Sequence, residues 1–248
     1  PKNFIEFGCS DYEEANTRLI LEQKNWSGLI IDNSRKNIEN IKKQEFFWKH
    51  DLVAICKNIQ KDNIDYIINQ NSKFKEIGIL SIDIDGNDFW VWKNIQKIKP
   101  FIVVCEFNAI FGDLNYLTIP YEPNFFRSSK HYSNLYFGCS ILALIKLAKE
   151  KSYTFLGTNL NGVNAFFIRS DQSRNILKKI KFTNAYPSKI RESRNKYNQL
   201  NFLDMSARVN EIKELELLNL KNQKLVKIKD LKALNSKEWS EHKPRILA

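Results

Sequence analysis

The chain has 248 residues, of which 43% are hydrophobic and 12% aromatic, so it can bury a large core as an α/β domain with or without an appendage. No apolar run approaches the roughly 20 residues that cross a bilayer, and the first residues lack the basic and apolar regions of a signal peptide. We therefore exclude a transmembrane segment and expect a cytoplasmic protein.

The net charge of +11 is unevenly distributed along the chain. From Arg169 to the end there are 19 Lys/Arg against 9 Asp/Glu, whereas residues 1–168 hold 20 against 19. The first part, which holds the predicted catalytic residues, is therefore nearly neutral. The basic part is either a solvated surface or a face that attracts an anionic partner.

The four cysteines are widely spaced and form no CxxC pair. They are Cys9, Cys56, Cys105 and Cys139. We expect buried thiols rather than metal ligands or disulfides.

Apolar runs alternate with helix-length segments in the first third of the chain. Predicted strands are FIEFG, ending at Gly8, then GLIID, ending at Asp32, and EFFWKHD, ending at Asp51. Helices are expected after the first two strands and over residues 55–69. Alternation of this kind predicts a parallel, doubly wound sheet.

Residues 79–108 read as strand, helix, strand. Both strands end on acidic or amide side chains, and ligands in open parallel sheets lie outside the carboxyl ends of the strands. We therefore expect Asp83, Asp85, Asp88, Glu106 and Asn108 at one rim of the sheet.

The segment 109–136 is aperiodic and rich in aromatic residues. A structureless stretch this long is usually functional or disordered, and its aromatic residues argue against disorder. We interpret it as a substrate lid. Its candidate side chains are Tyr116, Tyr121, Arg127, His131 and Tyr132.

A buried helix over 137–151 and a hairpin turning at Asn161-Gly162 complete the predicted sheet with an antiparallel pair. Beyond this pair the chain is basic, and apolar residues over 206–234 recur at helical spacing, as in an amphipathic helix or helical pair. We expect those helices to pack on the domain or on a partner subunit, as in a homo-oligomer.

The strand ends favour one class of cofactor. Gly8 permits close backbone approach, and Asp32 follows at a spacing typical of an acid that binds ribose hydroxyls. One glycine is too few for a dinucleotide-binding loop, and no P-loop motif is present. A ligand with ribose and a cationic head fits better, with Glu6 at the amine and Asp51 at the adenine. S-adenosylmethionine is such a ligand.

The motifs FIEFGCSDYEEANT, GLIIDNS, ILSIDIDGNDFWVWKNI, FIVVCEFNA and SILALIKLAKEKSYTFLGTNLNGVNAFFI resemble the FkbM-type family of S-adenosylmethionine-dependent methyltransferases over roughly residues 4–169. The resemblance implies a doubly wound class I methyltransferase sheet of seven strands, Rossmann-like and mostly parallel, that ends in an antiparallel hairpin.

The same resemblance assigns roles to individual residues. It implies that Glu6, Gly8 and Asp32 bind the cofactor, with Asp11 as the acid of the first loop. The signature D-x-[DE]-G falls on Asp83, Asp85 and Gly86. One departure is that Tyr12 follows Asp11, where the family often has glycine.

These expectations divide the chain into a methyltransferase domain over 1–169, with its lid at 109–136, and a basic, mainly helical extension over 170–248. Methyl transfer to oxygen needs an aligned acceptor and a base. Candidate bases are Asp83, Glu106 and His131. Carboxylates crowded at one rim repel one another and raise one another's pKa, which suits a base. Alternatively, Asp83, Asp85 and Glu106 hold a divalent cation such as Mg²⁺, which relieves this repulsion.

We expect an O-methyltransferase that acts on a hydroxyl of a sugar, glycan or related small metabolite. Asn108 and the polar and aromatic lid residues would contact this acceptor. Two alternatives stay open: a nucleic-acid methyltransferase that uses the basic C-terminal part, and a non-catalytic nucleotide-binding or interaction protein.

Overall fold

A computed structural model describes residues 1–180 and 183–247. The chain forms two compact units. Unit 1 comprises Pro1–Ile84 and Trp90–Val104, and unit 2 comprises Asp85–Phe89 and Cys105–Ala248.

The strands of the largest sheet follow the apolar runs of the sequence. They are β1 Asn3–Phe7, β2 Ser27–Asp32, β3 Leu52–Cys56, β4 Ile79–Ile82, β5 Ile102–Glu106, β7 Tyr153–Thr158 and β8 Asn164–Arg169. Their order is β3-β2-β1-β4-β5-β8-β7. The pairs β1/β2, β1/β4 and β2/β3 are parallel, and β7/β8 is antiparallel. The structure thus confirms the predicted seven-stranded, mostly parallel sheet with an antiparallel pair.

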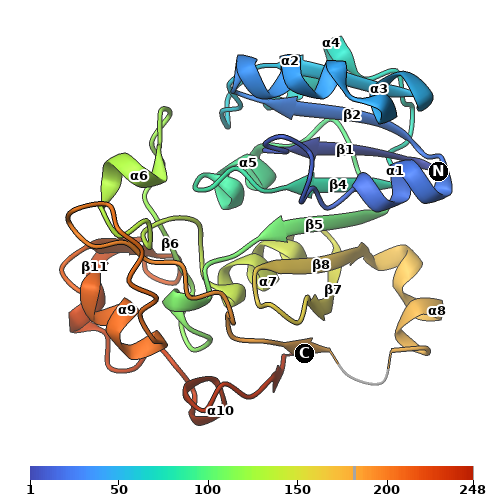
Figure 1. Ribbon diagram of the computed structural model, residues 1–248. Helices are drawn as coiled ribbons and strands as arrows, with labels where there is room; N and C mark the ends of the chain where they lie inside the picture. Colours follow the sequence, from blue (N-terminus) through green and yellow to red (C-terminus); the bar gives the residue numbers. More distant parts are fainter. Residues whose placement is uncertain (181–182, 248) are drawn as a thin grey trace. The chain divides into compact units, whose positions relative to one another are not determined.

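In unit 1, short helices alternate with β1 to β4. They are α1 Arg18–Lys24, α2 Arg35–Lys43, α3 Glu45–Lys49 and α4 Ile64–Asn71. The helix α5 Asp88–Asn94 follows β4, and its residues are divided between the two units. All residues of β1 from Phe4 to Phe7 are buried, as expected for an interior parallel strand with both faces covered. Figure 1 shows α2 and α3 together beside β2.

The predicted strand EFFWKHD is wrong. Residues Glu45–Lys49 form α3, in which Glu45 and Lys49 pair one turn apart while Phe46 packs against Tyr12. The true strand, β3, begins only at Leu52. Asp51 therefore precedes β3 and lies at its amino end, not at the carboxyl end where a cofactor acid was predicted.

Unit 2 contains β7 and β8, the helix α7 Ile141–Glu150, and many short elements. These are η1 Ala109–Phe111, β6 Leu117–Thr118, α6 Arg127–Lys130, η2 Ser170–Gln172, α8 Ser173–Leu177, β9 Asn184–Ala185, α9 Met205–Glu211, β10 Glu216–Asn219, β11 Lys224–Lys227, η3 Ile228–Asp230, α10 Lys237–Ser240 and β12 Arg245–Ile246. The predicted helix over 137–151 is confirmed by α7, and the hairpin by β7 and β8.

The C-terminal part is not the predicted helical extension. Strands β10 and β11 pair antiparallel where an amphipathic helix or helical pair was expected, and β6 adds a third strand, as Figure 1 shows beside α6 and α9. The turn at Gln223, which has a positive φ of 59°, breaks the helical pattern. The helical pair through which we predicted self-association is therefore not formed.

One hydrophobic core joins the predicted lid to the C-terminal part of unit 2. Ile110, Leu117 and Leu135 of the lid segment are buried together with Met205 and Leu217. Each such side chain contributes about 1.5 to 3 kcal/mol when fully buried. The two segments therefore depend on each other for their fold.

A buried carboxylate fixes the end of the chain within unit 2. Asp113 is fully buried, accepts hydrogen bonds from the backbone N and Oγ of Ser236 at 2.8 and 2.7 Å, and pairs with Arg245 at 2.7 Å. Trp239, also fully buried, donates from Nε1 to the carbonyl of Ala109 at 3.2 Å. These bonds anchor residues far apart in sequence.

Three of the four cysteines are buried as predicted, but Cys56 at the end of β3 is exposed. All four are free thiols. Among residues 1–180 and 183–247, no helix has the length and apolar character to span a membrane.

Replacing Asp113 with alanine should lower the free energy of unfolding by about 2 to 4 kcal/mol, because Ser236 and Arg245 lose their buried partner. Urea unfolding followed by tryptophan fluorescence measures this change. Glu241→Ala, which removes only exposed ion pairs, is the control and should leave the midpoint nearly unchanged. Equal midpoints for the two variants would contradict the anchoring role of Asp113.

Candidate functional site

The loop after β1 is held at the carboxyl ends of neighbouring strands in unit 1. Gly8 donates its backbone N–H to the Ile31 carbonyl at 2.9 Å and has a φ of +74°. A Cβ added to Gly8 would lie 1.6 Å from the Asp83 carbonyl oxygen. Only glycine fits this position, which explains the single glycine of the loop.

Asp32 connects this loop to the end of β2. Its Oδ2 accepts a hydrogen bond from the Ser10 backbone N at 2.9 Å, and its Oδ1 accepts one from the Ser34 N at 2.7 Å. Each carboxylate oxygen can accept a second bond, so two acceptor positions remain for a pair of vicinal hydroxyls. The predicted role of Asp32, to bind the ribose hydroxyls of a cofactor, requires these two acceptor positions.

Glu6, predicted as an amine-binding acid, lies near the end of β1 and uses its carboxylate oxygens within the protein. It is 1% exposed, its Oε1 accepts from the Asn16 N at 2.9 Å, and its Oε2 accepts from the backbone N and Oγ1 of Thr17. Thr17 directly precedes α1. Glu6 thus fixes the path of the chain into α1. Burial raises its pKa above the ordinary value for a glutamate.

The two remaining acids assigned to the cofactor lie on the surface of unit 1. Asp11 is exposed and accepts a hydrogen bond from the Glu13 N at 3.1 Å, within the loop itself. Asp51 pairs with Lys73 at 2.6 Å at the amino end of β3, and this pairing lowers its pKa. The position of Asp51 is incompatible with the predicted adenine contact.

The motif after β4 contributes turns and an ion pair to unit 2. Asp85 has a φ of +56° and pairs with Arg127 at 2.8 Å. Asp88 is fully buried, and its Oδ2 accepts from the Gly86 N at 2.9 Å at the start of α5. Asp88 therefore has the turn-forming role that is common at helix N-termini. A Cβ on Gly86 would lie 2.2 Å from the Phe125 ring, so glycine is required there too.

A cavity of about 110 Å³ lies at the carboxyl end of β5, entirely within unit 2. We call it the Glu106 cavity. It is lined by charged, polar and aromatic side chains, among them Glu106, Asn108, Arg127, Phe137, Glu192 and Arg208. Three of these, Glu106, Asn108 and Arg127, were predicted from the sequence to contact the acceptor or act on it.

Two of the predicted residues already use their polar groups within the protein. Asn108 donates from Nδ2 to the carbonyls of Leu135 and Phe137 at 2.9 and 3.0 Å and accepts from the Ile110 N at 3.0 Å. Arg127 pairs with Asp85 and Glu192, and its guanidinium stacks on Phe137 at 4.2 Å. Both therefore shape the cavity wall.

The other predicted lid residues are dispersed over unit 2. Tyr121 lines a second hollow of about 460 Å³, beside Phe125, Tyr136, Leu215 and Lys227. Tyr116 stacks with Lys221, and Tyr132 hydrogen-bonds Glu211. Tyr116 and Tyr132 do not line the Glu106 cavity.

His131 stacks on Tyr132 with the ring centroids 4.2 Å apart, and its Nδ1 lies 2.7 Å from the Ser133 Oγ. Burial lowers its pKa below the ordinary histidine value, which leaves the ring neutral at pH 7. It does not line the Glu106 cavity, so Glu106 is the better placed of these two candidate bases.

Sequence reasoning missed Arg208. The signal was present, because Met205, Arg208 and Ile212 follow at spacings of three and four residues, which places an arginine within an apolar helical stripe. Arg208 is only 3% exposed.

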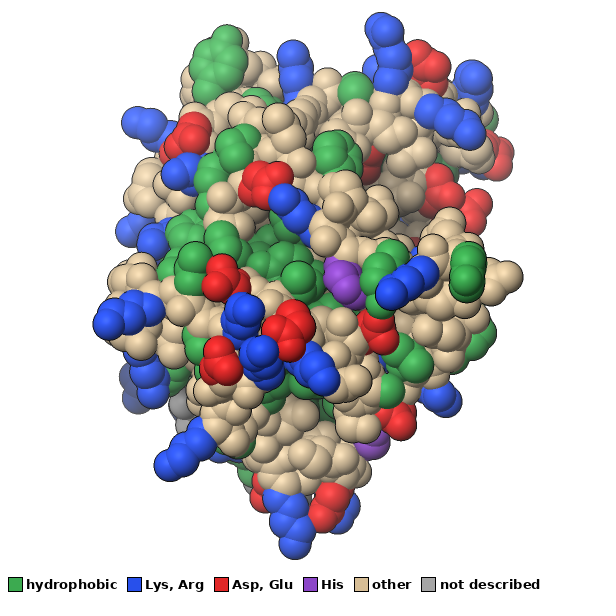
Figure 2. Space-filling view, turned by 90° about the vertical axis from the view of Figure 1, so that its left-hand side faces the viewer, with side chains coloured by type: hydrophobic (Ala, Val, Ile, Leu, Met, Phe, Trp, Pro, Cys, Tyr) green, Lys and Arg blue, Asp and Glu red, His purple; other side chains and the backbone are tan. Residues whose placement is uncertain are grey.

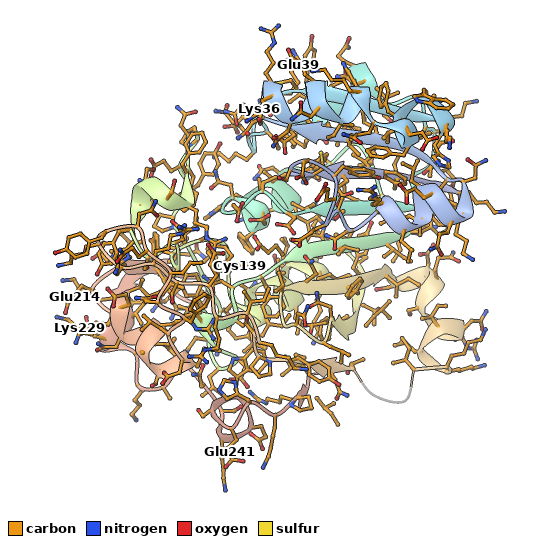
Figure 3. The ribbon with its side chains drawn as sticks, viewed as in Figure 1. Lys36, Glu39, Cys139, Glu214, Lys229 and Glu241 are labelled. Carbon is orange, nitrogen blue, oxygen red and sulfur yellow. The ribbon has the colours of Figure 1, made fainter. Side chains whose placement is uncertain are left out.

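The basic C-terminal part is not a uniformly positive surface. Glu214 pairs with Lys229 at 2.9 Å and with Lys227 at 3.7 Å, and Glu241 pairs with Lys243 at 2.7 Å. Figure 2 shows acidic and basic side chains interspersed on one face of the molecule, and Figure 3 shows Glu214 and Lys229 close together. The net positive charge is thus partly neutralised locally.

No metal site is supported. Within the described part of the chain, no three side chains of His, Cys, Asp and Glu are placed to hold one metal ion. The predicted cation at Asp83, Asp85 and Glu106 therefore has no basis in the structure.

No family model and no curated protein matches the chain. Among solved structures, it is similar to the methyltransferase domain of bacterial CtHen1-C, with 14% identity over 67% of this chain and 89% of that one and a TM-score of 0.43. It is also similar to the N-terminal domain of EvdMO1 with SAH bound, with 8% identity over 67% and 72% and a TM-score of 0.40. A methyltransferase from Clostridium acetobutylicum ATCC 824 gives 10% identity over 67% and 83% and a TM-score of 0.38.

The buried Glu6 should make stability depend on pH. Its raised pKa means that the folded state binds a proton more tightly than the unfolded state, so this contribution is complete below about pH 4.5 and is lost as the pH rises through the folded-state pKa. The free energy of unfolding of the wild type should therefore fall with rising pH relative to that of Glu6→Gln, which cannot titrate. Urea titrations from pH 4 to pH 8 measure the difference. A difference that stays flat across this range would refute the assignment.

Proposed function

We propose that the protein is an S-adenosylmethionine-dependent O-methyltransferase that acts on a hydroxyl of a sugar, glycan or related small metabolite, as members of the FkbM-type family do. The observation that carries this proposal is Asp32 at the carboxyl end of β2, bonded to the loop that follows β1. The strand order β3-β2-β1-β4-β5-β8-β7, with β7 and β8 antiparallel, is the arrangement that the family resemblance implies.

In this proposal, residues of unit 1 hold the cofactor. Asp32 accepts hydrogen bonds from the ribose hydroxyls, and Gly8 lets the backbone of the loop approach the ligand. The bound cofactor supplies an electrophilic methyl group on a sulfonium. Glu6 acts indirectly, because it fixes the start of α1 and with it the shape of the loop.

Residues of unit 2 prepare the acceptor. Glu106 lines the cavity and would accept the proton of an acceptor hydroxyl bound there. Asp83, at the end of β4, is the alternative base in unit 1. Arg127 and Asn108 keep the cavity in shape, so the acceptor is positioned before transfer.

Asp32→Ala should weaken binding of S-adenosylmethionine and S-adenosylhomocysteine at least about tenfold, because hydrogen bonds to a charged group contribute about 1.5 to 3 kcal/mol. Calorimetry on the full chain measures both affinities.

Asp51→Ala is the matched control for this experiment. It removes another acid of unit 1, at the amino end of β3, and should leave cofactor affinity unchanged. If neither ligand binds the wild type, the proposal of a methyltransferase fails. If both variants bind like the wild type, the assignment of Asp32 fails.

A nucleic-acid acceptor is a second candidate, favoured only by the excess of basic residues after Arg169. Binding of RNA or DNA that uses these charges should weaken steeply with salt, because each phosphate contact releases counterions. Filter binding of a labelled oligonucleotide between 50 and 200 mM salt separates the two. We expect no tight, salt-dependent binding, and a steep slope would favour the nucleic-acid acceptor.

A further inference from the structure

Arg208 is a buried cation that makes no ion pair with the described residues. It is 3% exposed, and among residues 1–180 and 183–247 no acidic oxygen lies within ion-pairing distance of it. Burial and the like charge of Arg191 lower its pKa, and the carboxylate of Asp204 opposes this shift only in part. An unpaired buried charge is costly, so proteins retain one where it has a partner to bind.

The hydrogen bonds of Arg208 use only part of the guanidinium. Nη1 donates to the Ile190 carbonyl at 2.5 Å, and Nη2 contacts only the Met205 Sδ at 4.0 Å. Nε is buried and makes no hydrogen bond. Nε and Nη2 lie on the same edge of the guanidinium, which is the edge that carboxylate and phosphate oxygens bind in a bidentate manner.

This edge belongs to a residue of the Glu106 cavity. The other arginine of the cavity, Arg127, is already paired with Asp85 and Glu192, whereas Arg208 makes no ion pair with the described residues. Met205 covers part of this edge, and its flexible side chain can move when an anion enters.

We propose that the Glu106 cavity binds the anionic group of a hydroxylated acceptor, a carboxylate or phosphate on a sugar, with its oxygens on the Nε and Nη2 edge of Arg208. The choice of a hydroxylated ligand rests on the proposed function, whereas the anion site rests on Arg208 alone. Glu106 accepts a hydroxyl of the same ligand. The acceptor is therefore a sugar acid or sugar phosphate rather than a neutral sugar.

Calorimetry with D-glucuronate, D-glucose 6-phosphate and D-glucose tests this proposal on the full chain at constant ionic strength. The acidic sugars should bind at least about tenfold more tightly than glucose, since only they bring charge-assisted hydrogen bonds to Arg208. The first two ligands distinguish a carboxylate from a phosphate. Equal binding of glucose, or no binding of either anion, would overturn the proposal.

Arg208→Met removes the charge and keeps a side chain of similar length. Affinity for the acidic sugar should fall at least about tenfold, while the melting temperature without ligand should stay close to that of the wild type or rise, because an unpaired buried charge is lost. A purely structural arginine would give the opposite pattern, with a lower melting temperature and unchanged affinity.

Arg174→Met, an exposed position in α8, is the control and should change neither quantity. If Arg208→Met does not fold, the melting temperature of the wild type is compared in inorganic phosphate and in chloride of the same ionic strength. Phosphate should raise the melting temperature, and the absence of a rise would overturn the proposal. Binding of S-adenosylhomocysteine, measured separately, should be unaffected by Arg208→Met. If the anion site is wrong, only binding of the acidic sugars fails. If the methyltransferase proposal is wrong, binding of S-adenosylhomocysteine fails.

Discussion

The core shared by the segment after β5 and the last third of the chain is the constraint on which unit 2 depends. Ile110, Leu117 and Leu135 are buried against Met205 and Leu217, so neither segment can bury its apolar side chains alone. The buried Asp113 bonds then hold the chain end against the same segment. The wall of the Glu106 cavity is built from both segments and exists only when this core has formed.

The sequence predicted the parallel sheet well because its strands are continuous apolar runs, which two covered faces require. The prediction of secondary structure was wrong in segments whose composition is compatible with both a helix and a strand. In EFFWK, aromatic residues suggested a strand, but the pairing of Glu45 with Lys49 and the burial of Phe46 favour a helix. In β10 and β11, leucines spaced three and four apart suggested a helix, whereas pairing with β6 determines the strands, and that contact is far away in sequence.

The sequence predicted where several residues of the candidate site lie, but not which contacts each of them makes. Asp32 and Glu106 lie at the strand ends where the pattern placed them, since the end of a buried strand is a local property. The roles of Glu6 and Asn108 could not be predicted, because their hydrogen-bond partners are backbone groups whose positions depend on loops. Asp51 was assigned to the wrong end of the third strand, because the strand was predicted to end at Asp51 and in fact begins after it, at Leu52.

Arg208 is a charged residue within a stripe of apolar residues on α9, and such an exception to the apolar pattern can indicate a binding site. The positions Met205, Arg208 and Ile212 lie on one face of a helical stripe that packs into the shared core, and a leucine or methionine at the middle position would cost no charge burial. The same core that excludes water also strengthens any interaction made by the guanidinium, because the local dielectric constant is low. A buried charge that costs free energy in the fold is therefore well suited to bind an anion, and a ligand that also donates a hydrogen bond can use the Glu106 side chain in the same cavity.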